Sequence, residues 1–205
     1  MKQQEKTRRT QELILAAAMK EFGAKGCEAA SINRICTASG VSKGLLYHNF
    51  TSKDDLYIHC IQKCFSEMTR YLQAQDLAAG DVGRLLALRE RFLTEHPDHK
   101  GLVLGSVILP PAHLCAQIRE ARQAFDSFCM DHYRQALSRL TLRPQITPEM
   151  ALNYFVVFMD MFNSYFEQKA RQGENHETLM KLHEENLAAA FDMMLYGIAR
   201  PEGEA

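Results

Sequence analysis

The stretch Ser31-Ile-Asn-Arg-Ile-Cys-Thr-Ala-Ser-Gly-Val-Ser-Lys-Gly-Leu-Leu-Tyr-His-Asn-Phe50 decides the fold of the N-terminal part of this chain. Ser31 and Ser42 are of a residue type that caps helix N-termini, and Gly40 lies between them where a turn needs a positive φ. The stretch therefore predicts two short helices joined by a tight turn. The second, from Ser42 to Asn49, has a cationic, hydroxyl-rich and aromatic face, as in a helix-turn-helix that places one helix in the major groove of DNA.

Helices are predicted on both sides of this stretch. A first helix runs over about 7–23, ends at Gly23 and Gly26, and has an apolar face at helical spacing. That face consists of Leu13, Ile14, Ala17, Ala18 and Phe22. Leu45, Leu46 and Phe50 are predicted to pack back onto it. Ser52 caps a fourth helix, which continues to about residue 71.

The remainder is predicted to be helical too, so the fold class is all-α with about nine helices. We expect helices over about 82–95, 102–109, 112–140, 148–171 and 176–198, with breaks at Pro97, Pro110-Pro111 and Pro144. The predicted domains are a three-helix helix-turn-helix head over 1–56, with its core at 31–50, and a helical-bundle body over 57–205.

Charge is unevenly distributed along the 205 residues, although the formal net charge is only −1. Residues 1–63 hold ten lysines and arginines against six acidic residues, and residues 64–205 hold the other fourteen against nineteen. A basic head on an acidic body predicts that only the head meets nucleic acid. A polar N-terminus, no long apolar stretch and six cysteines set in helical patterns predict a cytoplasmic protein with no membrane partner.

Residues 7–56 closely resemble the DNA-binding head of the TetR family of bacterial transcriptional regulators. The matching residues are Ile14, Ala17, Ala18, Phe22, Gly26, Ser31, Ile32, Ile35, Ser39 to Gly44, Leu46 to Phe50 and Ser52 to Leu56. The resemblance implies a homodimer that reads a palindromic operator in double-stranded DNA, with half-sites roughly one helical turn apart. It also implies a body that binds a small-molecule effector and thereby controls the two heads.

The predicted DNA contacts follow from the geometry of the second short helix. Lys43 can donate to guanine or to a phosphate, and Tyr47, four residues later, shares its face. Gly44 allows close approach to the duplex. The full predicted set is Ser31, Arg34, Ser42, Lys43, Gly44, Tyr47, His48 and Lys53. The serines would also be caps in any helical protein.

The helices over about 148–171 and 176–198 are predicted to form the dimer contact. Met150 to Phe166 is apolar nearly all round, so this helix faces its own core and a partner at once. The predicted seam on the last helix is Leu179, Leu182, Leu187, Phe191, Met194, Leu195 and Ile198. The alternative is that both helices form the core of a monomer.

An effector pocket in the body is predicted from apolar side chains that could equally fill a solid core. These are Met68, Tyr71, Phe92, Phe125, Phe128, Phe155, Met159 and Phe162. Arg89, Arg122 and His132 are candidates to orient a polar group of the ligand. The interpretation is a repressor that a small, largely hydrophobic effector releases from DNA.

An alternative is a metal- or thiol-redox-sensing regulator. Cys60 and Cys64 lie four residues apart next to His59, and four body histidines could join them. These are His96, His99, His113 and His132. Neither a metal site nor a cofactor is predicted on these grounds. Catalysis is not predicted either, because the sequence has no nucleophile elbow, phosphate loop, zinc-protease motif or dinucleotide fingerprint.

Overall fold

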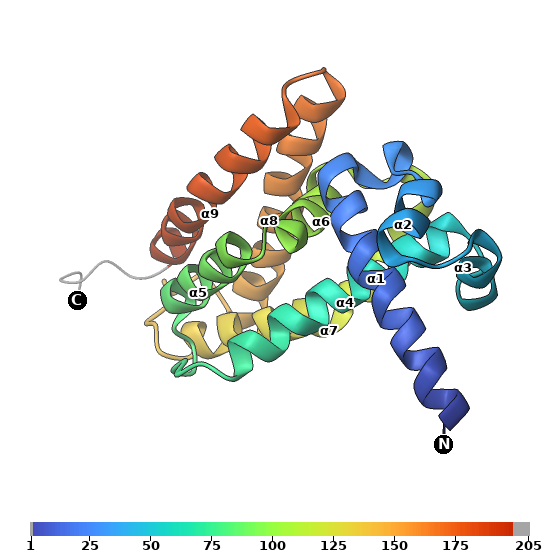
Figure 1. The fold of residues 1–205 in the computed structure, drawn as a ribbon. Coiled ribbons are helices and arrows are strands. Elements are labelled where there is room, and N and C mark those ends of the chain that lie inside the picture. Colours follow the sequence, from blue (N-terminus) through green and yellow to red (C-terminus); the bar gives the residue numbers. More distant parts are fainter. Residues whose placement is uncertain (1, 199–205) are drawn as a thin grey trace. The chain divides into compact units, whose positions relative to one another are not determined.

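The computed structural model describes residues 2–198, and within this range its elements are nine α-helices and one short 3₁₀ helix, which confirms the all-α class (Figure 1). The elements are α1 (Lys2–Ala29), α2 (Ile32–Ser39), α3 (Lys43–Asn49), α4 (Lys53–Gln73), α5 (Val82–Glu95), α6 (Pro97–Ile108), η1 (Ala112–Leu114), α7 (Cys115–Leu137), α8 (Pro148–Arg171) and α9 (His176–Ile198).

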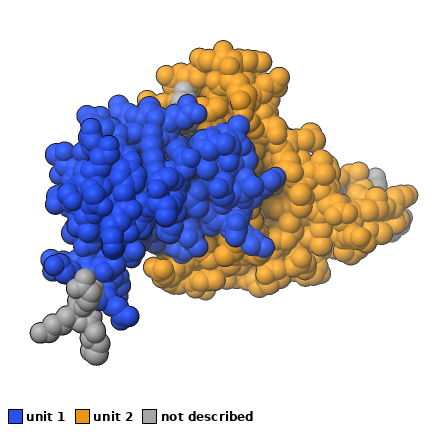
Figure 2. Space-filling view, turned by 90° about the vertical axis from the view of Figure 1, so that its right-hand side faces the viewer, with its two compact units in different colours: residues 1–68, 93–106, 110–123 blue, residues 69–92, 107–109, 124–205 orange. Residues whose placement is uncertain are grey.

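The chain divides into two compact units, coloured in Figure 2 and described here one at a time. Unit 1 consists of residues 1–68, 93–106 and 110–123, and unit 2 of residues 69–92, 107–109 and 124–205. Unit 1 thus contains the helix-turn-helix stretch together with most of α4 and α6 and the start of α7.

The core of unit 1 is built by the apolar faces of its first four helices. Phe22 of α1 meets Tyr57 of α4 edge to face, with ring centroids 5.1 Å apart. Other fully buried side chains here are Ile14, Ala18, Ile35, Leu46 and Leu56. The prediction that Leu13 and Leu45 pack into the core is wrong, because Leu13 is 49% exposed and Leu45 is 42% exposed.

The first helix is longer than predicted at both ends. It begins at Lys2, and Gly23 does not end it. Gly26 does interrupt it, with φ 74° and ψ 174°, and one further turn leads to Ala29. Similarly, α6 begins at Pro97 and not near residue 102, and the helix predicted over 112–140 consists of η1 followed by α7.

Gly23 instead marks a close crossing of α1 and α6. A Cβ atom built on Gly101 would lie 2.1 Å from the carbonyl oxygen of Gly23, and one built on Gly23 would lie 2.5 Å from the carbonyl oxygen of Asp98. The two backbones therefore approach one another more closely than any side chain at these positions would allow.

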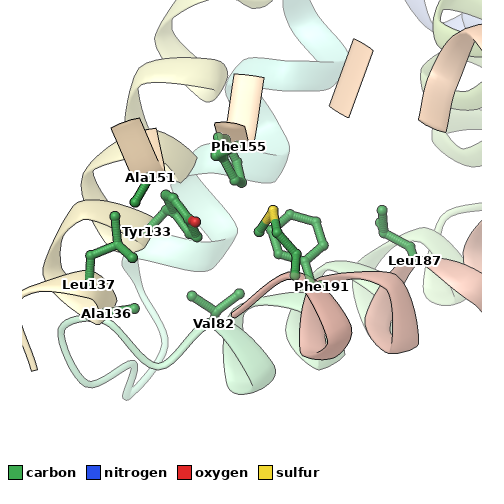
Figure 3. Packing of buried hydrophobic residues seen from close by; sticks show 9 residues of the cluster. Val82, Tyr133, Ala136, Leu137, Ala151, Phe155, Leu187 and Phe191 are labelled. Atoms are coloured by element: carbon green, nitrogen blue, oxygen red, sulfur yellow. The ribbon is translucent and has the colours of Figure 1, made fainter. Parts of the chain in front are cut away.

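In unit 2 an apolar cluster joins α5, α7, α8 and α9 (Figure 3). Tyr133 of α7 stacks on Phe155 of α8 with ring centroids 4.2 Å apart, and Phe155 meets Phe191 of α9 at 5.5 Å. The other buried members are Val82, Ala136, Leu137, Ala151, Leu187 and Met194.

Helix α8 has two apolar faces, as its sequence predicts. Ala151, Phe155 and Phe166 are buried within unit 2. A second stripe at helical spacing is exposed in the single chain, and it consists of Met150, Tyr154, Val157, Met161 and Tyr165.

The predicted seam on α9 needs correction. Four of its members are buried in unit 2 itself, namely Leu179, Leu187, Phe191 and Met194. Leu182 is exposed as predicted, together with Met193 and Tyr196, which the sequence pattern does not single out. Leu195 is half-buried, and the side chain of Ile198 lies outside the described residues. Among residues 2–198, no single helix is both long and apolar enough to span a membrane.

Candidate nucleic-acid interface and body cavity

The turn between α2 and α3 is fixed by local hydrogen bonds. The Ser31 hydroxyl accepts the backbone N–H of Arg34 at 3.4 Å, and the Ser42 hydroxyl accepts that of Leu45 at 3.2 Å. Gly40 adopts φ 69° and ψ 18°, a left-handed conformation that a glycine reaches without strain. Both predicted caps and the predicted turn are therefore present.

Helix α3 is held by one face and leaves the other open. Leu46 is fully buried and Phe50, which follows the helix, is nearly so. Lys43, Gly44, Tyr47 and His48 are exposed. Because Lys43 and Tyr47 are one turn apart, their side chains share a face of the helix. The exposed side chains offer an ammonium, a phenol and an imidazole to a DNA groove or to phosphates. Gly44 has no side chain, so the helix backbone can approach the duplex closely.

Two of the predicted contact residues are engaged within unit 1. The Lys53 ammonium donates to the backbone carbonyl of Glu28 at 2.7 Å and so ties the end of α1 to the start of α4. Arg34 is exposed but lies 4.0 Å from a carboxylate oxygen of Glu21, which also accepts the backbone N–H of Ser31 at 3.1 Å. An ammonium has three donors, so Lys53 still has N–H groups to offer a phosphate.

The start of α4 has both local contacts and one contact with a residue that is distant in the sequence. The Ser52 hydroxyl accepts the backbone N–H of Asp55 at 3.0 Å and caps the helix as predicted, and the Asp55 carboxylate accepts the backbone N–H and the hydroxyl of Thr51. These bonds are short-range. The partner of Asp54, by contrast, is distant in sequence, since His113 Nε2 lies 3.0 Å from Asp54 Oδ2. Such pairs depend on how helices pack, and no motif signals them.

The thiols proposed as sensors are unsuited to that role. Cys60 and Cys64 are fully buried, and burial raises the pKa of each thiol far above its usual range. Burial also raises the pKa of Cys27 to about 11. Because the thiolate is the form that reacts and binds metals, these groups are inert at neutral pH.

The histidines of the metal alternative also have other partners. His99 Nε2 lies 2.7 Å from Glu67 Oε2, and His132 Nδ1 lies 3.1 Å from the carbonyl oxygen of Phe128. Among the described residues, no group of three or more histidine, cysteine or acidic side chains is placed to hold a metal ion. The sensing alternative is not favoured.

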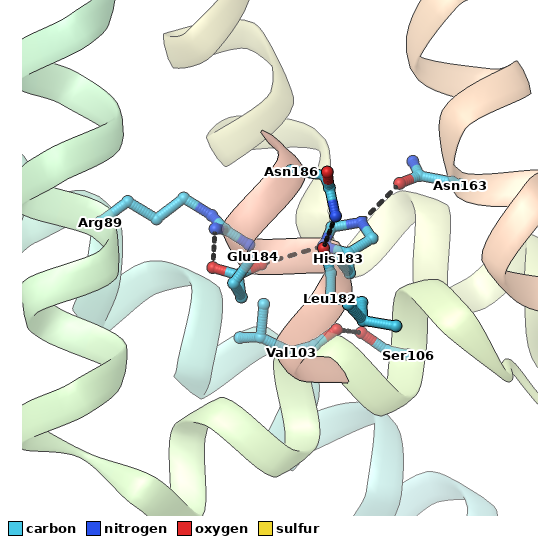
Figure 4. Close-up of polar contacts among 8 residues, drawn as sticks. All are labelled: Arg89, Val103, Ser106, Asn163, Leu182, His183, Glu184 and Asn186. Atoms are coloured by element: carbon cyan, nitrogen blue, oxygen red, sulfur yellow. Dashed lines mark hydrogen bonds and ion pairs between the residues drawn. The ribbon is translucent and has the colours of Figure 1, made fainter. Parts of the chain in front are cut away.

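Unit 2 holds a buried polar network between α5, α8 and α9 (Figure 4). Arg89 donates to Glu184 at 2.5 Å, His183 Nδ1 lies 3.0 Å from the other carboxylate oxygen, and His183 Nε2 lies 3.1 Å from Asn163 Oδ1. Burial alone would raise the pKa of Glu184, but the Arg89 charge and the two hydrogen bonds outweigh it and lower that pKa to about 2.

A small cavity of about 30 Å³ lies beside this network in unit 2. It is lined by Val82, Leu85, Leu86, Arg89, Phe125, Cys129, Tyr133, Phe155 and Phe191. As it stands, it has room for one or two water molecules, whereas pockets for drug-sized ligands are roughly ten times larger or more.

The eight residues predicted for the effector pocket do not all border this cavity. Phe125 and Phe155 line it. Of the others, Met68 is buried in unit 1, Tyr71 packs on Phe92, Phe128 packs on His132, and Met159 and Phe162 pack against the apolar cluster of unit 2. Of the residues predicted to orient a ligand, Arg89 lines the cavity. Helical periodicity identifies which face of each helix points inward, but it does not show which of the inward side chains border a cavity.

The comparison with known protein families finds a match in the N-terminal part of the chain. The sequence model of the family described as "Bacterial regulatory proteins, tetR family" matches residues 14–60. FasR, an HTH-type transcriptional activator of Mycolicibacterium smegmatis, is 32% identical over 131 residues, which are 62% of this chain and 58% of FasR. The chain spans less than two thirds of the length of the curated relatives that it matches.

Solved structures share the fold over nearly the whole chain. A transcriptional regulator from Rhodococcus sp. Rha1 superposes with a TM-score of 0.61 at 18% identity, covering 93% of this chain and 99% of its own. The regulator FadR of Bacillus subtilis, in complex with stearoyl-CoA, gives a TM-score of 0.61 at 13% identity, covering 91% and 98%. Both units thus have the architecture of these regulators.

Proposed function

Because this chain belongs to the TetR family of bacterial regulatory proteins, we propose that it is a sequence-specific DNA-binding regulator of transcription. The observation that carries the proposal is the exposed face of α3, with Lys43, Gly44, Tyr47 and His48 side by side on a helix anchored by Leu46. The contacts supplied by Ser31, Ser42, Arg34 and Lys53 then position the head on the phosphates, while α3 reads bases.

The experiment is a selection of bound sites from random double-stranded DNA, followed by titration of the selected site by fluorescence anisotropy. We expect a palindromic site and an affinity that falls steeply with salt, since phosphate contacts release counterions. An affinity that hardly changes with salt, or the absence of any enriched sequence, would exclude the basic head as a DNA-reading surface.

Lys43→Ala tests the recognition face directly. We expect at least about tenfold weaker operator binding and a salt slope smaller by about two, because the dimer loses one cationic contact from each of its two heads. Lys181→Ala is the matched control, since Lys181 is an exposed lysine on α9 in unit 2 whose loss removes the same charge. Circular dichroism checks that both variants remain helical, and equal affinities for the two variants would contradict the assignment.

We further propose that the protein acts as a homodimer through α8 and α9. The support is the exposed apolar stripe on α8 and the neighbouring exposed Leu182, Met193 and Tyr196 on α9. A single chain would leave these large apolar side chains in water, whereas a bundle of four helices, two from each subunit, would bury them. Pairing of two subunits would also bring their two DNA-binding heads to the two halves of one palindromic operator.

The proposed mode is repression in the cytoplasm, relieved when a small and largely apolar effector binds the body. The cavity in unit 2 supports a body site. The Bacillus subtilis FadR structure, whose fold this chain shares, is a complex with stearoyl-CoA, a ligand with a long apolar chain. A reporter gene placed behind the selected site should be transcribed more strongly when this protein is absent. Lower transcription would indicate activation.

A further inference from the structure

The exposed face of α3 contains an aliphatic side chain, that of Leu45, which forms neither hydrogen bonds nor ion pairs. Leu45 is 42% exposed, almost the same fraction as Tyr47 at 41%, although its sequence neighbour Leu46 is fully buried. Exposed leucines are common on protein surfaces, but this one lies among the residues that would meet DNA.

The geometry of the helix places Leu45 at the edge of the face that would enter the groove. Successive residues of an α-helix are about 100° apart, so Leu45 and Tyr47 lie at that angle on either side of the buried Leu46. For the same reason Gly44 and His48 lie almost opposite Leu46. Leu45 and Tyr47 therefore flank the outward positions symmetrically, and the absence of a side chain at Gly44 lets both approach the base edges.

The backbone of Leu45 is held by side chains on both sides of it. The Ser42 hydroxyl accepts its N–H at 3.2 Å, and the Asn49 side-chain amide donates to its carbonyl oxygen at 2.8 Å. The helix itself is anchored in the core of unit 1 by Leu46 and the adjoining Phe50. The position of Leu45 is therefore fixed before DNA binds, so little further ordering is needed when its side chain makes a contact.

We infer that Leu45 reads a thymine in each operator half-site through the C5 methyl group of that base. The base edges in the major groove present hydrogen-bonding groups, and the thymine methyl is the apolar group among them. Leu45 excludes water from this methyl. A base without it leaves a gap or turns a polar group toward the leucine, and both are costly. The inference rests on the proposed function, because it names a base that α3 selects.

The test replaces thymine by uracil, which pairs with adenine in the same way and lacks only the C5 methyl group. In the operator selected from random DNA, each thymine is exchanged for deoxyuridine together with its symmetry mate in the other half-site. Fluorescence anisotropy then measures the affinity of the full-length protein. Burial of one methyl group contributes roughly fourfold in affinity, so we expect one symmetric pair of exchanges to weaken binding about fifteenfold.

Leu45→Ala shows whether Leu45 is the side chain that contacts this methyl. We expect the variant to bind the thymine and uracil operators equally, both about as weakly as the parent binds the uracil operator. The matched control is Leu13→Ala, because Leu13 is a comparably exposed leucine of unit 1 that lies on α1, and this variant should keep the full preference for thymine. Both positions are exposed, so the core stays intact, which circular dichroism checks. A preference for thymine that survives in Leu45→Ala would assign the methyl to another side chain and overturn the inference.

The behaviour of the parent chain separates this inference from the proposed function. If the parent selects a palindromic site but tolerates uracil at every thymine, or if the selected half-site has no thymine, the role of Leu45 is wrong and the regulator function stands. If the parent selects no DNA at all, the proposed function fails and the inference fails with it.

Discussion

At the scale of single residues, Glu184 shows how one carboxylate depends on its surroundings. Its side chain is almost fully buried, and it is compensated by Arg89 on α5 and by His183 beside it. Such a pair adds little stability compared with apolar residues of the same volume, but removal of one partner leaves an isolated buried charge. The network therefore links α5 to α9 specifically, at a site that tolerates little change.

This carboxylate predicts a pH dependence of stability. The pKa of Glu184 is about 2 in the folded protein, against an ordinary value of 4.5, so its contribution is fully present above about pH 5 and is lost as the pH falls toward 2. The shift corresponds to about 3 kcal/mol of unfolding free energy. Glu184→Gln mimics the protonated acid and should therefore be less stable than the parent by about that amount at pH 7.

Urea unfolding followed by circular dichroism at several pH values measures the difference. We expect the stability gap between the parent and Glu184→Gln to shrink steadily between pH 5 and pH 3. Joint replacement of Arg89 and Glu184 by leucine is the control, because it lacks both the charge pair and this pH-dependent contribution. A gap that stayed constant down to pH 3 would mean that the pKa of Glu184 is not lowered.

At the scale of helices, the crossing of α1 and α6 depends on two glycines. An added methyl group on Gly101 would meet the backbone carbonyl of Gly23, which cannot move as a side chain can. Gly101→Ala should therefore destabilise the protein by about 1–3 kcal/mol, the usual cost of overpacking.

Gly105→Ala provides the comparison within the same helix. A Cβ atom at Gly105 would have no neighbour within 4 Å, so this variant should be neutral or up to about 1 kcal/mol more stable, through better helix propensity. The midpoints of urea unfolding report both effects. Similar midpoints for the two variants would show that the crossing relaxes without cost.

The same scale shows what the sequence can predict and why. The caps at Ser31 and Ser42 and the left-handed Gly40 depend on neighbours within four residues, and all three predictions are confirmed. The helix pattern predicts wrongly that Leu13 and Leu45 are buried, because such a pattern indicates an apolar face but not how wide its buried part is.

Features that depend on packing between distant segments could not be predicted. The approach of Gly101 to Gly23 joins positions 78 residues apart, and the chain offers no local signal for it. For the same reason the sequence analysis names Arg89, Phe125 and Phe155 as ligand candidates but misses the other residues that line the cavity, which are Val82, Leu85, Leu86, Cys129, Tyr133 and Phe191. The DNA contacts remain predictions, although the exposure of Lys43 and Tyr47 agrees with them.

At the scale of the whole molecule, pairing through α8 and α9 predicts that a charge in the exposed stripe separates the subunits. Met161 is 65% exposed in the single chain and lies in the middle of that stripe. Met161→Asp should weaken the dimer at least about a hundredfold, because the carboxylate would be buried without a partner.

Sedimentation of the variant across a range of concentrations tests this, with Leu13→Asp as the control. Leu13 is a comparably exposed apolar residue of α1, outside the proposed interface. We expect the control to remain dimeric like the parent and Met161→Asp to become monomeric and to lose tight operator binding. A parent chain that sediments as a monomer would show that α8 and α9 form the core of a single subunit.

The anchoring of α3 has a consequence for how this protein can change over generations. Leu46 and the adjoining Phe50 hold the helix, whereas the positions that would touch DNA take no part in the core. Substitutions at Lys43, Tyr47 or His48 can then alter the preferred target sequence at almost no cost in folding. A duplicated copy of the gene could acquire a new set of promoters through a few exchanges on one short surface, while it inherits its scaffold intact.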